Sequence, residues 1–267
     1  MLQRVDVGGQ CLAVEDSGAG RPVLLVHGFP LDHSMWNAQI ESLARRYRVI
    51  APDLRGFGQS DRLPTDCTAV TMARFADDLA KVLDALEVEG PVALGGLSMG
   101  GYIALEFWRR HQRRVGKLML CDTRAAPDAP EALAARFQNA IRAEAEGPAF
   151  LADTLLPRLV APETLRANTE AVSRLRRMIA AAAPRSVAAA LRGMACRSDA
   201  RPWLAAIRCP TLVLVGQHDA ISPPDEMQAI AAEIPHARFE IIPSAGHMAP
   251  MENPSATNAA LESFLSD

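Results

Sequence analysis

The sequence predicts an α/β protein with a mostly parallel central sheet of about eight strands and helices on both faces. Two observations lead to this prediction. Short apolar runs bounded by turn residues recur along the 267 residues, and segments of helical periodicity alternate with them. Continuous apolar runs suit strands buried on both faces, and their alternation with helices is typical of a parallel sheet. A third observation, a long stretch without a strand run, predicts a helical cap inserted after the sixth strand.

The expected strands are of two kinds. The first two alternate apolar and polar residues on either side of Gly8-Gly9, which predicts an antiparallel hairpin at a sheet edge. The other six are continuous apolar runs, as expected for buried parallel strands. The eight segments are 2–7, 11–15, 22–26, 48–51, 91–94, 117–121, 210–215 and 238–242.

The expected helices lie between these strands and collect apolar residues on one face. Within 71–86, for example, Phe75, Leu79 and Leu86 recur at helical spacing. The same reasoning predicts the remaining helices of the core, at 36–46, 100–111, 224–234 and 253–265.

One segment interrupts the alternation of strands and helices. Residues 125–200 are rich in Ala and Arg and contain no convincing strand run. We therefore expect several helices that form a cap or lid over a core domain. The core would consist of residues 1–124 and 201–267. The alternative is that these helices are simply part of a single domain.

Composition and charge exclude several classes of function. With 49% hydrophobic and 22% charged residues, the chain has the composition of a globular protein rather than a disordered one. Its 28 basic and 31 acidic residues leave a net charge of −3, so no basic stripe is expected for nucleic acid or for an anionic membrane. No apolar run approaches the length needed to cross a bilayer.

The N-terminal residues and the cysteines indicate the compartment in which the protein is expected. The first residues lack the basic and then apolar pattern of a secretory signal. The five cysteines are scattered, without the spacing of a disulfide framework or a zinc site. We therefore expect a cytoplasmic protein with reduced thiols, no metal and no cofactor, and we make no prediction of its oligomeric state.

The strongest functional motif is Gly-x-Ser-x-Gly, formed by Gly96, Ser98 and Gly100. It follows an expected buried strand and opens a helix, the context in which a serine hydroxyl is presented on a strained turn. Side chains two residues before and after the serine would collide with neighbouring backbone, so glycine is expected there. The helix beginning at Met99 directs its positive end toward the serine, which favours an oxyanion. Dinucleotide-binding and phosphate-binding loops need glycine or lysine spacings that are absent here.

A nucleophilic serine needs a base and a carboxylate that orients the base. His247 is the one histidine of six in a glycine-flanked loop directly after the last expected strand, and Asp219 follows the strand before it. Both lie at carboxyl ends of strands, where sites of parallel sheets form. The order Ser98, Asp219, His247 matches one of the known triad orders. Asp122, which ends the strand before the cap, is the alternative acid, and we favour Asp219.

Acyl transfer also needs two backbone N–H donors for the developing oxyanion. Met99, directly after the serine, is expected to supply one. The other is expected from the loop His27-Gly28-Phe29-Pro30 after the first parallel strand. Phe29 is the predicted donor because Pro30 has no N–H, whereas His27 is expected to be structural.

Taken in order, these motifs resemble those of the α/β-hydrolase family. The matching segments are His-Gly-Phe-Pro at 27–30, Asp-Leu-Arg-Gly-Phe-Gly-Gln-Ser at 53–60, Gly-Leu-Ser-Met-Gly-Gly at 96–101, Gly-Gln-His-Asp at 216–219 and Gly-His at 246–247. The resemblance covers nearly the whole chain and implies that 53–60 is a structural turn.

The resemblance leaves several subfamilies open. Haloalkane dehalogenases and epoxide hydrolases use an aspartate nucleophile, and Ser98 argues against both. The segments 96–101 and Pro-Met-Glu-Asn-Pro at 250–254 are similar to those of 3-oxoadipate enol-lactonases. The segment 27–30 looks more like that of esterases and of cofactor-free haloperoxidase or perhydrolase relatives.

We therefore expect a serine hydrolase, similar to carboxylesterases, that cleaves carboxylic esters through an acyl-enzyme. The expected partner is a small-molecule ester or lactone. The alternatives are an enol-lactonase, a cofactor-free perhydrolase or haloperoxidase, and a non-enzymatic receptor built on the same fold.

Further residues are predicted to contact the substrate. Trp36 and Met248, together with Phe29 and Met99, suggest a small or medium, mostly apolar acyl or alkoxy group. In a lactonase, Arg124 or Arg158 would bind a substrate carboxylate; the alternative is that these arginines lie on solvated helix faces.

Overall fold

A computed structural model describes residues 1–167 and 169–267 of the chain. In this described part, eight strands form a single sheet in the spatial order β1-β2-β4-β3-β5-β6-β7-β8. The strands are β1 Leu2–Asp6, β2 Cys11–Gly18, β3 Pro22–Val26, β4 Arg48–Pro52, β5 Val92–Leu97, β6 Val115–Cys121, β7 Thr211–Gly216 and β8 Arg238–Ile242. Each coincides with an expected strand, and the predicted fold class is confirmed.

Strand direction follows the two kinds of sequence pattern. β1 and β2 pair antiparallel with β1 at the edge, which confirms the predicted hairpin. β2 also pairs antiparallel with β4, and from β4 to β8 every neighbouring pair is parallel. All six residues of β7 are buried, whereas β8, at the other edge, is only partly buried. Apolar continuity thus corresponds to burial on both faces.

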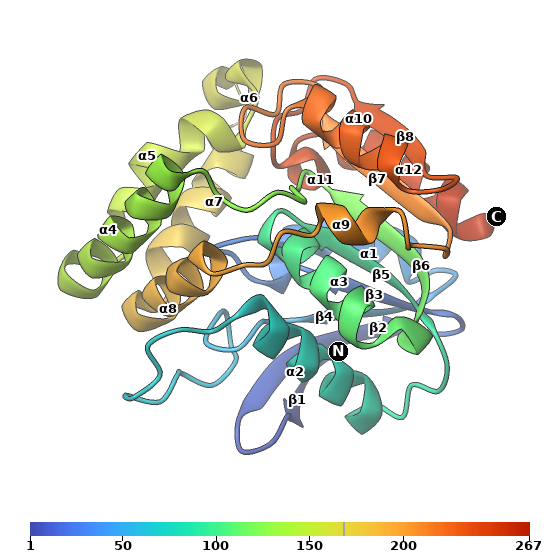
Figure 1. Ribbon diagram of the computed structural model, residues 1–267, viewed down its shortest axis with the longest axis horizontal. Helices are drawn as coiled ribbons and strands as arrows, with labels where there is room; N and C mark the ends of the chain where they lie inside the picture. The colour runs from blue at the N-terminus through green and yellow to red at the C-terminus, as the bar shows by residue number, and fades with distance from the viewer. Residues whose placement is uncertain (168) are drawn as a thin grey trace.

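Helices cover both faces of the sheet. α2 packs on α3 at one face, and α1 packs on α12 at the other (Figure 1). The helices that flank the sheet are η1 His33–Trp36, α1 Asn37–Leu43, α2 Met72–Ala85, α3 Met99–Arg110, η2 Gln112–Arg114, α10 Pro224–Glu233, α11 Ala249–Glu252 and α12 Pro254–Ser266. Among the described residues, no helix is long and apolar enough to cross a membrane.

Side-chain caps explain where two of these helices begin. The Thr71 hydroxyl accepts a hydrogen bond from the Arg74 N–H at the start of α2. The side-chain oxygen of Asn253 accepts a hydrogen bond from the Ala256 N–H at the start of α12. Each cap provides an acceptor for a backbone donor that has no partner within the helix.

The segment between β6 and β7 is helical, as predicted. Its members are α4 Pro130–Glu146, α5 Phe150–Leu159, α6 Pro162–Ala167, α7 Thr169–Ala181, α8 Pro184–Ala195 and the short α9 Arg201–Leu204. We refer to α4–α8 as the inserted helices. They lie together at one side of the sheet (Figure 1). Their treatment as a separate cap with boundaries at 125–200 stays a prediction.

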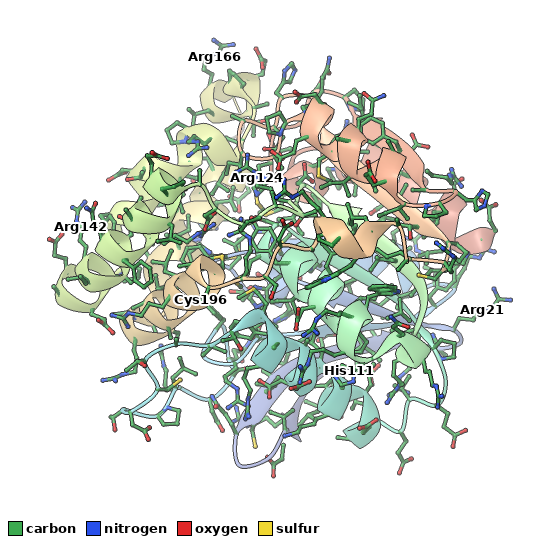
Figure 2. The ribbon with its side chains drawn as sticks, in the orientation of Figure 1. Arg21, His111, Arg124, Arg142, Arg166 and Cys196 are labelled. Atoms are coloured by element: carbon green, nitrogen blue, oxygen red, sulfur yellow. The ribbon has the colours of Figure 1, made fainter. Side chains whose placement is uncertain are left out.

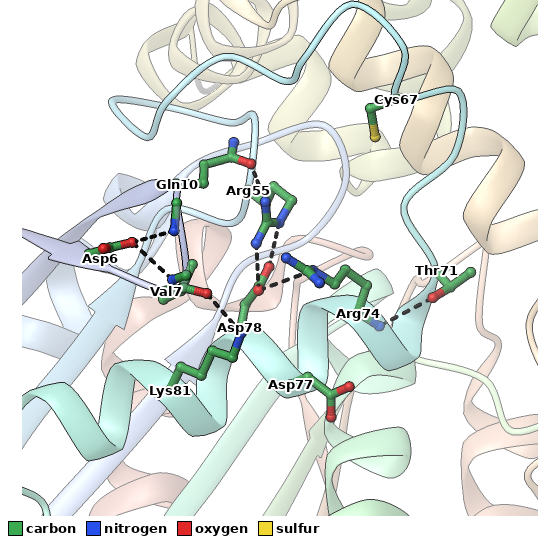
Figure 3. Close-up of polar contacts among 12 residues, drawn as sticks. Asp6, Val7, Gln10, Arg55, Cys67, Thr71, Arg74, Asp77, Asp78 and Lys81 are labelled. Carbon is green, nitrogen blue, oxygen red and sulfur yellow. Dashed lines mark hydrogen bonds and ion pairs between the residues drawn. The ribbon is translucent and has the colours of Figure 1, made fainter.

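A buried ion pair holds the turn after β4 against α2 (Figure 3). The Arg55 guanidinium donates to both carboxylate oxygens of Asp78, with Nε–Oδ2 and Nη2–Oδ1 distances of 2.6 and 2.7 Å. Arg55 also donates to the side-chain oxygen of Gln10. Arg74 Nε lies 3.3 Å from Asp78 Oδ1. Planar guanidinium and carboxylate groups match in this two-bond geometry, so the turn is held in one orientation.

Candidate active site

Ser98 occupies a sharp turn between β5 and α3. Its backbone has φ 54° and ψ −114°, a conformation that costs about 1–3 kcal/mol for a residue other than glycine. The end of β6 holds this turn in place. The Ser98 N–H donates to the Cys121 carbonyl at 3.0 Å, and the Ser98 carbonyl accepts from the Thr123 hydroxyl at 2.7 Å. Ser98 is only partly buried, whereas its neighbours Leu97 and Met99 are buried.

The two motif glycines are required by close backbone approaches. A Cβ atom on Gly96 would lie 2.1 Å from the Gly100 carbonyl oxygen. A Cβ atom on Gly100 would lie 2.3 Å from the Val26 carbonyl oxygen at the end of β3. Both distances are far below van der Waals contact, which confirms the steric prediction. The close packing brings the serine turn against the end of β3.

The loop 27–30 after β3 therefore lies beside Ser98. A Cβ atom on Gly28 would lie 3.6 Å from the Ser98 Cβ atom. The Gly28 N–H donates to the Met35 sulfur at 3.4 Å and is already used. Within the described part of the chain, the N–H groups of Phe29 and Met99 donate to no other protein group. The two predicted oxyanion donors thus remain free.

His27 shapes this loop. It is fully buried, and its Nε2 accepts from the Leu54 N–H at 2.9 Å while its Nδ1 faces the Gly28 carbonyl oxygen at 2.8 Å. Nδ1 is therefore assigned the proton. Burial lowers the pKa of His27, which favours this neutral form. Both ring nitrogens are occupied by backbone groups, in line with the structural role expected for His27.

Asp219 and His247 meet at the carboxyl ends of β7 and β8. His247 Nδ1 lies 2.8 Å from Asp219 Oδ2, and both side chains are buried. The second oxygen of Asp219 accepts from the N–H groups of Ile221 and Ser222 at 2.7 and 2.9 Å. Because the carboxylate fixes the proton on Nδ1, the lone pair of His247 is on Nε2.

Asp122, the alternative acid, directly follows β6 and lies beside this pair. Its Oδ1 accepts from the Gly216 N–H at 2.8 Å. Its carboxyl, the Asp219 carboxyl and the His247 ring each have an atom within 4.8 Å of the others. The carboxyl that accepts the hydrogen bond of the imidazole Nδ1–H is that of Asp219, the acid favoured by the sequence.

Among the described residues, two groups of acidic and histidine side chains lie close enough together to be candidate metal sites. They are Asp122, Asp219, His247 and Asp32, His33, Asp53. In each, a histidine Nδ1 lies at direct hydrogen-bond distance from a carboxylate oxygen, at 2.8 and 2.6 Å. Two ligands that each bind one ion at about 2.1 Å lie roughly 3 Å or more apart. The geometry of both groups is that of hydrogen-bonded pairs.

Comparison with known proteins identifies the family of this chain. The family profile described as alpha/beta hydrolase fold matches residues 21–254. The chain belongs to the α/β-hydrolase fold family. The matched range includes β3 to β8 of this hydrolase, together with Ser98, Asp219 and His247.

Individual relatives support the same assignment. The AB hydrolase superfamily protein YisY of Bacillus subtilis is 34% identical over 266 residues, covering 95% of this hydrolase and 94% of YisY. A thermophilic esterase from Thermogutta terrifontis is 49% identical with a TM-score of 0.95, covering 100% of this chain and 98% of the esterase. The enol-lactonase from Burkholderia xenovorans LB400 is 27% identical with a TM-score of 0.91, covering 99% and 100%.

The predicted substrate contacts of this hydrolase lie in different environments. Trp36 and Met248 are both fully buried. Arg124, labelled in Figure 2, donates to Glu226 of α10 at 2.7 and 3.1 Å, so its charge is already paired. Arg158 is exposed, and its contact is with the Ala220 carbonyl at 3.4 Å. A substrate role for each of these four residues stays a prediction.

Other arginines of the inserted helices lie on the surface. Figure 2 shows Arg142 and Arg166 at the outer edge of these helices, away from the sheet. Arg142 pairs with Glu146, and Arg166 pairs with Glu163, each within one helix. These pairs are exposed, as in ordinary solvated helix faces.

Glu252 of α11 is a residue whose role the sequence analysis missed. One carboxylate oxygen accepts from the Gly246 N–H at 2.8 Å, next to His247. The other accepts from the Ala161 N–H at 2.7 Å, in the inserted segment. The Met248 N–H also donates to the Leu159 carbonyl at 2.9 Å. The signal in the sequence was a glutamate between prolines, five residues after the histidine.

We expect Glu252→Gln to lower kcat/KM by about tenfold, because small displacements of a catalytic group have effects of this size or larger. An amide oxygen can still accept from Gly246, but the amide nitrogen then faces the Ala161 N–H, donor against donor. Steady-state kinetics and thermal unfolding measure the effect. The exposed Glu89→Gln is the matched control and should retain wild-type kinetics. Wild-type kinetics in Glu252→Gln would contradict this role.

Asp53 and His33 stabilise the turn and the loop around the site. Asp53 is fully buried and accepts from the His33 N–H and from the Gln59 N–H at 2.8 and 2.7 Å. Burial lowers the pKa of His33, but the hydrogen bond and charge of Asp53 outweigh it, and the net shift is upward. Burial raises the pKa of Asp53, but His33 outweighs it, and the net shift is downward.

These shifts predict a pH-dependent stability. The raised pKa of His33 stabilises the fold in acid and is lost as the pH rises through that pKa. The lowered pKa of Asp53 stabilises the fold above its unfolded pKa and is lost as the pH falls through the folded value. The pair therefore contributes most between about pH 4 and 6.5.

We expect His33→Gln to lower the free energy of unfolding by about 1 kcal/mol at pH 5.5 and by less at pH 8.5, after allowance for solvent screening. Urea unfolding at the two pH values measures this difference. His111→Gln, which removes an ion pair with Asp77 nearer the surface, is the control and should show a smaller effect. An equal loss at both pH values would be inconsistent with the titration of His33.

Proposed function

We propose that this hydrolase cleaves carboxylic esters with small or medium, mostly apolar groups through a covalent acyl-enzyme on Ser98. The observation that carries the proposal is the hydrogen bond from His247 Nδ1 to Asp219 Oδ2 at 2.8 Å. This hydrogen bond supports His247 Nε2 as the base. His247 and Ser98 both follow the carboxyl ends of strands, at the same edge of the sheet. The strained turn at Ser98 gives further support.

In the first half of the proposed reaction, the Ser98 oxygen attacks the ester carbonyl carbon while His247 Nε2 takes the hydroxyl proton. Asp219 stabilises the imidazolium that forms. The tetrahedral oxyanion accepts from the Phe29 and Met99 N–H groups, each expected to contribute about 3 kcal/mol to the transition state. The C–O bond then breaks, and His247 returns the proton to the leaving alcohol.

The second half repeats these steps with water. His247 takes a proton from water as its oxygen attacks the acyl-enzyme, and the proton is then delivered to the Ser98 oxygen as the acid leaves. In this proposal residues 125–200 act as a cap. The contact of Leu159 and Ala161 with the loop around His247 supports that role.

A second candidate is hydrolysis of an enol-lactone, a cyclic ester. The enol-lactonase from Burkholderia xenovorans LB400 has a TM-score of 0.91 with this chain, and this observation favours it. The same attack by Ser98 would open the ring, with the enolate oxygen as the leaving group. An enolate is a weaker base than the alkoxide of an ordinary ester. The leaving oxygen would therefore need less proton donation from His247.

The test is hydrolysis of p-nitrophenyl esters of increasing acyl length, with 3-oxoadipate enol-lactone assayed in parallel. Turnover that prefers short acyl chains and disappears in Ser98→Ala supports the esterase. Turnover of the enol-lactone with little activity on the esters selects the lactonase. If neither class is hydrolysed, the proposed function is wrong, and saturable binding without turnover would indicate a receptor.

A further inference from the structure

Asp122 is a buried titratable group that the proposed reaction does not use. Its side chain has no exposed surface, and that of Asp219 beside it is also buried. Oδ1 of Asp122 accepts from the Gly216 N–H. Oδ2 is buried and, among the described residues, meets no N–H or O–H donor. A buried carboxylate oxygen without a donor is costly, so this atom needs an explanation.

The charged side chains that raise the pKa of Asp122 are those of Asp219 and Glu252. The ionisable groups near it are Asp219 from the loop after β7, His247 from the loop after β8 and Glu252 from α11. Cys121, the preceding residue, is a buried thiol whose pKa is raised by burial. The Asp122 and Asp219 carboxyl groups thus lie beside one imidazole, and the His247 Nδ1–H already donates its hydrogen bond to Asp219.

Two adjacent buried carboxyl groups cannot both ionise without a large energetic cost. Asp219 is the one suited to be the carboxylate, because it accepts three N–H donors, from Ile221, Ser222 and His247. Asp122 accepts one, from Gly216. Burial first, and the charge of Asp219 second, raise the pKa of Asp122 well above its usual range.

The hydrogen bonds of Asp219 leave room for one more donor. A carboxylate has about four lone-pair positions, and three of those of Asp219 are filled. A proton on Asp122 Oδ2 would fill the fourth position and also remove the unpartnered oxygen. One proton therefore satisfies both side chains.

We propose that Asp122 is a neutral carboxylic acid that donates a hydrogen bond to Asp219 and thereby positions the carboxylate that orients His247. Asp122 is a positioning residue in this arrangement, because it acts through Asp219 and touches no reacting atom. Its effect on turnover rests on the proposed function, whereas its protonation does not.

Infrared spectroscopy tests the protonation without substrate. A difference spectrum between wild type and Asp122→Asn, recorded at neutral pH, should contain the carbonyl stretch of a protonated carboxylic acid in the wild type only. Carboxylate bands that differ between the two proteins instead, with no carboxylic acid band, would overturn the proposal. This measurement decides the protonation even if the protein hydrolyses no ester.

Kinetics tests the hydrogen bond and the charge. Asp122→Asn retains an oxygen for Gly216 and an N–H for Asp219, so kcat should stay within about threefold of wild type. The acid limb of the pH–rate profile should not move. If Asp122 were a carboxylate, its replacement would remove a buried negative charge and shift that limb by about one pH unit toward acid.

Asp122→Ala removes the donor and should lower kcat by about tenfold or more while KM changes little, with rescue by the asparagine variant. Wild-type kcat in folded Asp122→Ala would overturn the positioning role. So would a loss in Asp122→Asn as large as that in Asp219→Asn, because Asp122 would then be the orienting acid. If Asp122→Ala does not fold, the infrared spectrum and the asparagine pH profile still decide the proposal.

Discussion

Ser98→Ala is expected to lower kcat for ester hydrolysis by about 10⁶-fold, since loss of the nucleophile removes the acyl-enzyme route altogether. The fold should be retained. Ser98 holds its turn through backbone hydrogen bonds to Cys121 and Thr123, which alanine leaves in place. Alanine also has the same Cβ atom as serine at this positive φ, so the strain in the backbone is not increased.

The measurement is single-turnover and steady-state hydrolysis of the best p-nitrophenyl ester, with thermal unfolding of both proteins. The unfolding midpoint should agree with that of wild type. Ser34→Ala, at another partly buried serine, is the matched control and should keep most of the activity. More than about 1% residual activity in a clean Ser98→Ala preparation would contradict the nucleophile assignment, because loss of a nucleophile costs far more than 100-fold.

Asp219→Asn is expected to lower kcat by about 10³–10⁴-fold with a smaller change in KM, the effect of losing the carboxylate of a triad. The asparagine amide would meet the N–H groups of Ile221 and Ser222 with its oxygen and would turn its NH₂ group toward His247. Nδ1 would then have to accept, which places the ring proton on Nε2, where the base is needed.

Asp122→Asn serves as the matched comparison, because both variants replace a buried carboxyl with an amide of the same shape. The expected order is a large loss in Asp219→Asn and a small one in Asp122→Asn. Measuring kcat from pH 5 to 9 for both separates a pH shift from a loss at every pH. The reverse order would place the orienting acid directly after β6 rather than after β7.

The fold was largely predictable because its signals are local. Apolar runs such as that of β7 predict burial on both faces without reference to any partner. The hairpin of β1 and β2 follows from alternation around two glycines. The antiparallel pairing of β2 with β4 was not predicted, because pairing between distant strands depends on how the chain packs.

The predictability of the site varies in the same way from residue to residue. Ser98 lies within a five-residue motif whose glycines are needed by contacts at the turn itself. The sequence makes Arg124 a candidate for binding a substrate carboxylate, but it cannot show the ion pair with Glu226, which is 102 residues away. Glu252 went unassigned because its contacts with Gly246 and Ala161 join segments that only the folded chain brings together.

The sequence by itself determined the order of strands and helices and the serine turn, and it led to the prediction of His247 as the base. These depend on periodicity and sterics within a few residues, which the chain expresses wherever it folds. Only the tertiary structure decided that Asp219 contacts the imidazole and that Asp122 lies buried beside it. Hydrogen bonding and burial depend on side chains from several strand ends that meet in one place. The distances between those side chains are not contained in a linear sequence pattern.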